Sequence, residues 1–190
     1  MIMAKRKETQ APEEEVLNEV QAAEANAEEQ NTGIRCEATP ENDGVAIIDE
    51  EGQTLLIVAL NESQLAFGGD ESQDLEEDIP SPSMTGLDGE QRSAFLIDFY
   101  RSKEKNVPAL DACAEYGWLP SGGEMALIHA NKAAINEVLE ALGGTVLSDG
   151  RYWTSQRFSN DRMWSCDMAD GTFGIALGTA STAYVRAVKK

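Results

Sequence analysis

The chain has 190 residues, 42% of them apolar, which is enough for one main domain with a core of its own. It carries 34 acidic and 15 basic residues; segment 41–90 holds 14 carboxylates and neither Lys nor Arg, whereas 91–190 holds 11 of each sign. Such a front half excludes nucleic-acid binding, which needs a basic footprint, and docking on an anionic membrane. It is typical of a solvated, self-repelling surface, and the alternative is an acidic arm that meets a basic partner.

The first residues contain a basic cluster, Lys5–Lys7, but acidic residues follow it in place of the apolar segment of a secretory signal. No apolar run approaches membrane-spanning length. We therefore expect synthesis in the cytoplasm without a signal peptide, no membrane insertion, and an extracellular location only as part of a larger particle such as a phage virion.

Three widely spaced cysteines, Cys36, Cys113 and Cys166, form neither a disulfide framework nor a zinc-ligand pattern. We expect them to be small buried residues.

Residues 1–32 form an acidic arm without aromatic residues. Val16, Leu17 and Val20 give a thin apolar stripe at helical spacing, which indicates a helix that associates with copies of itself or with a partner. The alternative is disorder, because so narrow a stripe buries little surface.

The domain is expected to span 33–190 and to begin with strands at Ile34–Ala38, Val45–Asp49 and Thr54–Leu60, with a short fourth strand at Gln64–Phe67. Residues 70–87 are acidic with Ser and Pro, which predicts a long exposed loop. The loop lacks the regular ligand spacing of an EF-hand, so we expect no calcium there.

Two helices are predicted next. The first begins after Asp88, an N-cap candidate, and runs to Tyr100. The second runs from Val107 to Tyr116, with Pro108 in its first turn and Gly117 at its end.

Ser121 and Glu124 have the spacing of a capping box, which predicts a helix start at this point. Asn131 interrupts the helix, and an apolar face over 134–142 continues it. Gly143 is predicted to end it in the left-handed conformation.

The last forty residues predict four strands, Arg151–Ser155, Met163–Met168, Thr172–Leu177 and Ala183–Val188, with a hairpin turn at Ala169–Gly171. Two polar segments between them, 156–162 and 178–182, are expected to be exposed loops carried by one sheet. They predict either a binding face or solvated connections.

The chain is poor in catalytic groups. His129 is the only histidine, which excludes a multi-histidine metal site and leaves no spare base for a catalytic triad. The capping role accounts for Glu124, and no phosphate-binding glycine loop is present. We expect no enzyme activity, no metal and no cofactor.

Three tryptophans, Trp118, Trp153 and Trp164, lie in the second half of the chain, and we expect all three in the core.

Several motifs occur in a characteristic order between Asp88 and Val188. They are Trp118–Glu124, Ile135, Asn136, Leu139, Gly143, Gly144, Tyr152–Ser155, Trp164, Gly171 and Val185–Val188. Together they resemble the C-type lectin-like domain of the sulfatase-modifying, formylglycine-generating type. More closely they resemble a domain of unknown function from gut Bacteroidales and their phages, which neighbours the Fibrobacter paralogous domain.

The resemblance implies a compact α+β, C-type lectin-like fold, in which two or more helices pack on a twisted, mostly antiparallel sheet whose first and last strands lie close together. Proteins of this fold that retroelements diversify vary their C-terminal strands and loops, which form the ligand face. The corresponding positions are Gln156, Arg157, Phe158, Ser159, Asn160, Asp161, Arg162, Ser165, Asp167, Asp170, Thr179, Ser181, Thr182 and Tyr184.

The chain also departs from the families that it resembles. It has none of the Glu-Pro-Asn, Gln-Pro-Asp or Trp-Asn-Asp motifs of calcium lectins, nor the closely spaced cysteine pair of formylglycine-generating enzymes. Both departures point away from calcium-dependent sugar binding and from oxidase chemistry.

The expected function is therefore a non-enzymatic module that binds a protein or glycan on a cell surface, as a phage receptor-binding, tail-associated or retroelement-diversified protein. One alternative is a structural virion or assembly protein that self-associates through residues 1–32. A less favoured alternative is an enzyme of the formylglycine-generating type.

Overall fold

The computed structural model describes residues 33–68, 88–159, 162–175 and 180–190, without the side chains of Ser159 and Ile175. The predicted arm at 1–32 and the predicted loop at 70–87 lie outside these residues. The chain divides into two units, Met1–Ile34 and Arg35–Lys190. The second unit contains every helix and strand of the described residues.

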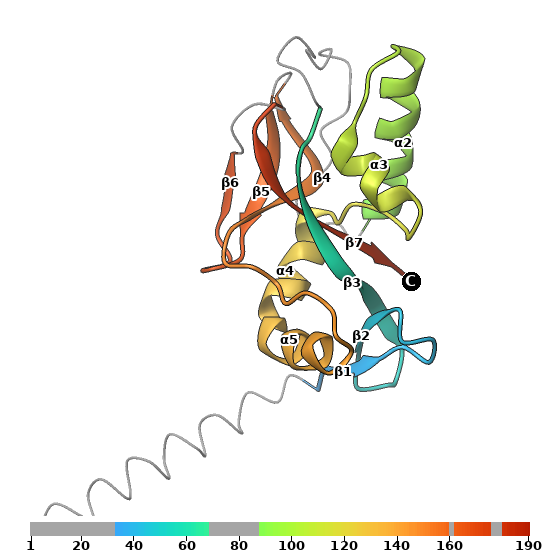
Figure 1. Ribbon diagram of the computed structural model, residues 1–190, viewed down its shortest axis with the longest axis vertical. Helices are drawn as coiled ribbons and strands as arrows, with labels where there is room; N and C mark the ends of the chain where they lie inside the picture. Colours follow the sequence, from blue (N-terminus) through green and yellow to red (C-terminus); the bar gives the residue numbers. More distant parts are fainter. Residues whose placement is uncertain (1–32, 69–87, 160–161, 176–179) are drawn as a thin grey trace, which may run out of the picture. The chain divides into compact units, whose positions relative to one another are not determined.

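The fold is α+β. Its described strands form one seven-stranded sheet in the order β1-β2-β3-β7-β4-β5-β6 (Figure 1). All neighbours are antiparallel except β4 and β7, which pair in parallel at Tyr152 and Tyr184, so the sheet is mixed. The strands are β1 Arg35–Ala38, β2 Gly44–Ile48, β3 Thr54–Ala66, β4 Arg151–Ser159, β5 Arg162–Asp167, β6 Phe173–Ile175 and β7 Thr182–Lys189.

The prediction of two separate strands over 54–67 is wrong, because β3 is one strand of 13 residues. Residues 54–59 pair with β2, and β7 pairs with Ile57 and Val58 and again from Glu62 on. Between Val58 and Glu62 the register against β7 shifts, so that Ala59–Asn61 lie opposite Ala187 alone. The polar residues at this shift resemble a turn in sequence, yet the two neighbouring strands hold them extended.

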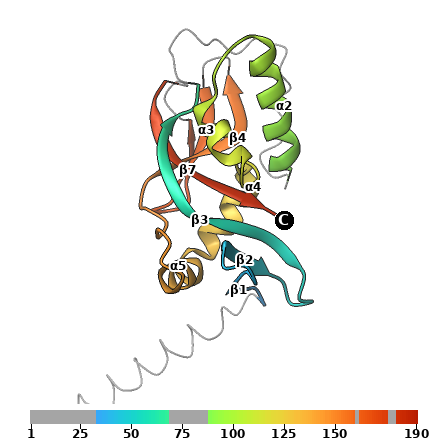
Figure 2. The same ribbon diagram turned by 45° about the vertical axis from the view of Figure 1, so that its right-hand side comes forward.

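Four helices are described: α2 Gly89–Ser102, α3 Pro108–Ala114, α4 Gly122–Ala130 and α5 Lys132–Ala141. Helices α2 and α3 pack against β3, β4 and β7, while α4 and α5 pack against β1, β2, β4 and β5 (Figure 2). The core beneath α2 and α3 is apolar and centres on Phe67, Tyr100, Leu110 and Trp153. None of these helices is long and apolar enough to cross a membrane.

The start of α4 confirms the predicted capping box. Ser121 Oγ accepts a hydrogen bond from the Glu124 amide at 3.3 Å, and the Glu124 carboxylate accepts one from the Ser121 amide at 2.7 Å. Trp118 Nε1 donates a further bond to the same carboxylate at 3.2 Å. Glu124 therefore fixes both the helix start and the tryptophan before it.

Asp88 precedes α2 as predicted, but its carboxylate makes no capping bond. It accepts bonds from the Arg92 guanidinium at 2.5 and 3.2 Å instead. The predicted left-handed end at Gly143 is confirmed, with a φ of 72°. The predicted turn at Ala169–Gly171 is also confirmed, because the Gly171 amide donates to the Asp167 carbonyl and β5 and β6 pair on either side.

Two expectations for the last forty residues are corrected. The predicted loop at 156–162 is strand on both sides, because β4 continues to Ser159 and β5 already begins at Arg162. Trp118 and Trp153 are buried as predicted, whereas Trp164 is only half-buried.

Candidate functional site

Three of the sequence-predicted binding residues lie in the interior. Gln156, Arg157 and Ser165 are 1%, 5% and 1% exposed. Gln156 Oε1 accepts a bond from the Gly122 amide at 2.8 Å, and the Ser165 hydroxyl donates to the Gly174 carbonyl at 3.2 Å. The expectation that Gln156 and Arg157 line an exposed loop is wrong, because β4 continues through both residues and their side chains lie inside the protein. Ser165, which was predicted as a strand residue of the ligand face, is buried as well.

Phe158 and Arg162 are exposed where β4 ends and β5 begins. Phe158 is 43% exposed, and its ring meets Trp164 edge to face, with 5.1 Å between ring centroids and 86° between planes. Arg162 pairs in register with Ser159 across the same strand pair. Phe158, Arg162 and Trp164 are called the Phe158 surface below. The sequence predicted Phe158 and Arg162 as binding residues but placed Trp164 in the core.

Asp167 and Asp170 do not belong to the Phe158 surface, because they lie at the opposite end of β5, in the turn to β6. Hydrogen bonds from the Thr172 hydroxyl and amide lower the pKa of Asp170. Asp167 accepts a bond from the Ala169 amide at 3.0 Å. Both carboxylates stabilise the turn.

The remaining predicted residues are dispersed or lie outside the described part. Thr182 is exposed at the first position of β7, and Ser181 before it is half-buried. The Tyr184 ring stacks on Tyr152 at 5.1 Å. Asn160, Asp161 and Thr179 lie outside the described residues, and the Ser159 side chain is not described.

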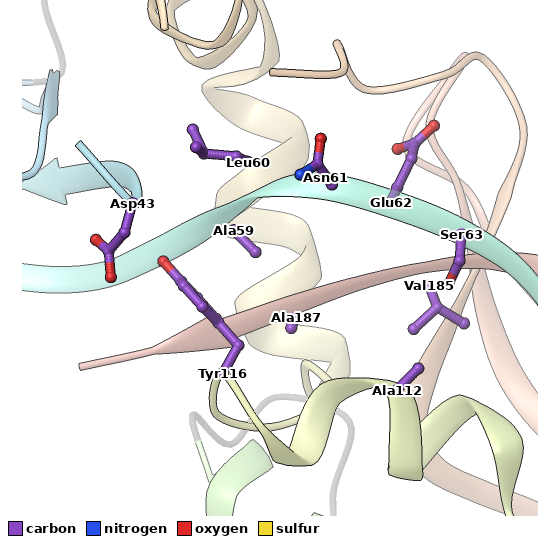
Figure 3. Close-up of a pocket in the computed structure, with 10 residues that line it drawn as sticks. All are labelled: Asp43, Ala59, Leu60, Asn61, Glu62, Ser63, Ala112, Tyr116, Val185 and Ala187. Carbon is purple, nitrogen blue, oxygen red and sulfur yellow. The ribbon is translucent and has the colours of Figure 1, made fainter. Parts of the chain in front are cut away.

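A groove that the sequence did not indicate lies between β3, β7 and α3 (Figure 3). Its volume is about 400 Å³, within the range of small-ligand sites. It lies where the register shift carries β3 away from β7, and small side chains, Ala59, Ala112 and Ala187, leave it open. A register shift depends on two strands at once, so no local pattern predicts the groove.

A buried ion pair braces β3 and β7 beside the groove. The Arg186 guanidinium, which is fully buried, donates to Glu62 at 2.7 Å and to the carbonyls of Ala59 and Thr145 at 2.9 and 2.7 Å. Ser148 Oγ also donates to Glu62, at 2.6 Å, as does the Tyr152 hydroxyl. Every one of these contacts joins two segments of the fold, so the network is structural.

The thiols are poor nucleophiles. Burial raises the pKa of Cys113 to about 12 and the pKa of Cys166 and Cys36 to about 11. None of the three forms a disulfide. Within the described residues, no group of three or more His, Cys, Asp or Glu side chains is arranged to hold a metal ion.

No protein-family model and no curated protein matches this sequence. The structure is similar to that of a fimbrial protein from Bacteroides ovatus ATCC 8483, with a TM-score of 0.58 and 15% identity. The match covers 70% of this chain and 35% of that protein, so this chain spans only part of its length. At this identity the similarity shows a shared fold and nothing of the function.

Proposed function

We propose that the protein is a non-enzymatic binding module with a C-type lectin-like fold, which recognises a protein or glycan on a cell surface through the Phe158 surface. The observation that carries the proposal is the exposed Phe158 ring held edge-on by Trp164. A phage tail protein or a retroelement-diversified protein is the context that the resemblance in the sequence suggests.

An aromatic pair of this kind suits recognition. Packing on Trp164 fixes the Phe158 ring, so little side-chain entropy is lost when a ligand covers it. Arg162 is exposed on the neighbouring strand, and aromatic and arginine side chains are the usual anchors of protein interfaces.

The thiols favour this proposal over an enzyme of the formylglycine-generating type. With pKa values of about 11 and 12, Cys166 and Cys113 are protonated near neutral pH, whereas the thiolate is the reactive form. A thiol reagent such as DTNB should therefore label neither in the native protein and both after unfolding in urea. Rapid native labelling of either thiol would support the enzyme.

The assembly alternative places the essential contacts in residues 1–32. Deleting that arm should leave binding through the Phe158 surface intact; loss of both oligomeric mass and binding would favour assembly instead.

The direct test compares two exposed phenylalanines. Phe158 is 43% exposed on β4 and Phe95 is 49% exposed on α2, so Phe95→Ser is a matched control for Phe158→Ser. The probes are a bacterial glycan array and intact Bacteroides cells. We expect Phe158→Ser to weaken binding at least about tenfold, as loss of an interface anchor does, and Phe95→Ser to bind like the wild type. Equal binding by all three proteins would refute the Phe158 surface.

A further inference from the structure

The groove between β3 and α3 has apolar walls and a polar end. Figure 3 shows Ala59 and Ala187 along its length, with the Asp43 carboxylate and the Tyr116 hydroxyl together at one end. The side chains of Leu60, Asn61 and Glu62 point away from α3, so β3 offers mainly backbone there. The residues that line the groove include two carboxylates and no Lys or Arg.

The polar end already holds an ammonium group. Lys189 extends from β7, and its Nζ forms an ion pair with Asp43. The same Nζ lies 4.5 Å from the centroid of the Tyr116 ring, within the range of a cation–π contact. A carboxylate and an aromatic face therefore bind the end of an alkylammonium chain that belongs to the protein itself.

We propose that this groove binds a primary alkylammonium group of a ligand, for which the Lys189 side chain is the internal stand-in. The nitrogen of the ligand replaces Lys189 Nζ between Asp43 and Tyr116, and its methylene chain lies along Ala59, Ala112 and Ala187. The proposal goes beyond the binding function proposed above, since the groove and the Phe158 surface have no residue in common.

The exchange requires only a side-chain rotation. The backbone of Lys189 stays paired with Ile57, while its side chain is already 28% exposed and can turn into solvent. The Tyr116 hydroxyl is buried and has no hydrogen-bond partner among the described residues. An ammonium group that reaches Asp43 from the groove side, displaced from the position of Lys189 Nζ, can donate to this oxygen, and a buried polar group gains from such a partner.

Charge selects the same class of ligand. Arg186 is committed to Glu62, and Lys189 remains paired with Asp43 until a second cation replaces it there, so an incoming anion meets two cations that already have carboxylate partners. The chain carries a formal net charge of -19, and an overall negative field concentrates cations at its surface. A carboxylate or phosphate ligand would therefore gain no unpaired cation at the groove, and the overall negative field would repel it.

The test titrates the full chain with n-butylammonium chloride and, as a neutral control of similar shape, with 1-butanol. Amide signals of Ala59, Ala112 and Tyr116 in ¹⁵N–¹H spectra report binding. We expect saturable shifts with butylammonium only. Lys189→Met should strengthen binding roughly tenfold, because it removes an internal competitor. Lys132→Met, which removes another ion-paired lysine far along the chain, should change nothing.

Asp43→Asn in the Lys189→Met background should abolish saturable binding. Tyr116→Phe, which removes only the hydroxyl, should weaken binding a few-fold. It keeps the test decisive if the Asp43 variant fails to fold. Equal shifts with butanol, or an unchanged affinity of Lys189→Met, would overturn the proposal.

Two probes distinguish the source of the ammonium group. Tighter binding of Nα-acetyl-lysine methylamide than of butylammonium would identify a lysine side chain of a partner protein. Tighter binding of butylammonium would identify a small free amine, because the groove would then exclude the peptide backbone.

Discussion

Two pairs of neighbouring strands, β3 with β7 and β4 with β5, share one irregularity and differ in what surrounds it. In the first pair Ala59–Asn61 lie opposite Ala187, and in the second Thr154–Gln156 lie opposite Trp164, so three residues face one in both. Such bulges interrupt the ladder and leave backbone groups without their usual partner. The surroundings decide how those groups are satisfied.

At β4 another segment of the chain packs against the interruption and covers it. Thr154, Ser155 and Gln156 are at most 2% exposed. The Ser155 amide donates to the Pro120 carbonyl at 2.8 Å, and Gln156 accepts from the Gly122 amide. The segment 118–122 thus enters beside the bulge and makes it part of the core.

At β3 the backbone groups of the interruption find their hydrogen-bond partners mainly on one side of the strand. The carbonyls of Ala59 and Leu60 accept bonds from Arg186 and from the Thr145 amide. On the other side the short helix α3 presents Ala112, which is too small to fill the space, and the groove remains. A bulge thus becomes core or groove according to the segment packed against it.

The largest expected effect concerns the ion pair that supports the open bulge. Arg186→Met should lower the free energy of unfolding by about 3–5 kcal/mol, because it leaves the buried Glu62 carboxylate without its charge partner. Urea unfolding followed by circular dichroism measures the loss. The double variant Arg186→Met/Glu62→Gln should recover part of it, and a loss well below that of other core variants would show that the pair is dispensable.

The filled bulge should be sensitive to a single side-chain amide. Gln156→Ala should cost about 1–3 kcal/mol, because the Gly122 amide at the start of α4 loses its buried acceptor. The same urea series measures the change, with Gln64→Ala on the exposed side of β3 as control. Equal unfolding midpoints for the two variants would show that the segment 118–122 does not depend on this bond.

Enlarging a side chain should separate the two bulges directly. Thr154→Leu should destabilise the protein by about 1–3 kcal/mol, because the packed core has no room for extra volume. Ala112→Leu enlarges a wall of the groove and should change stability by less than about 1 kcal/mol. It should also block butylammonium binding. Similar losses for both variants would mean that the groove is not open.

The smallest effect is a pH dependence at the end of the groove. The hydrogen bond from Lys189 lowers the pKa of Asp43 from 3.8. The ionised Asp43 therefore stabilises the fold above that pH, and its contribution is lost as the pH falls from 3.8 through the lowered pKa. Unfolding midpoints between neutral and acidic pH should fall less steeply for Asp43→Asn than for the wild type or Asp98→Asn. The difference should be small, because the Asp43 side chain is 39% exposed.

The predicted binding residues of β4 and β5 differ in their exposure. Phe158 and Arg162 are exposed as predicted, while Gln156 and Arg157 are buried although the same loop was predicted to expose them. Polar composition cannot distinguish these two sets. A polar side chain in a strand can be buried where another segment supplies a hydrogen-bond partner, as the Gly122 amide does for Gln156. No sequence pattern predicts the groove, because its walls are alanines that come from three separate elements.

The sequence by itself determined the features that depend on neighbours along the chain. The Ser121–Glu124 capping box starts α4, and Gly143 and Gly171 take left-handed conformations. The hairpin between β2 and β3 turns at the polar residues before Thr54. Each depends on interactions within about four residues. The tertiary structure alone decided that β3 continues through Ala59–Asn61, that Gln156 is buried and that a groove lies beside Asp43. Strand register and packing join residues far apart in the chain, and no local pattern records which partner each will meet.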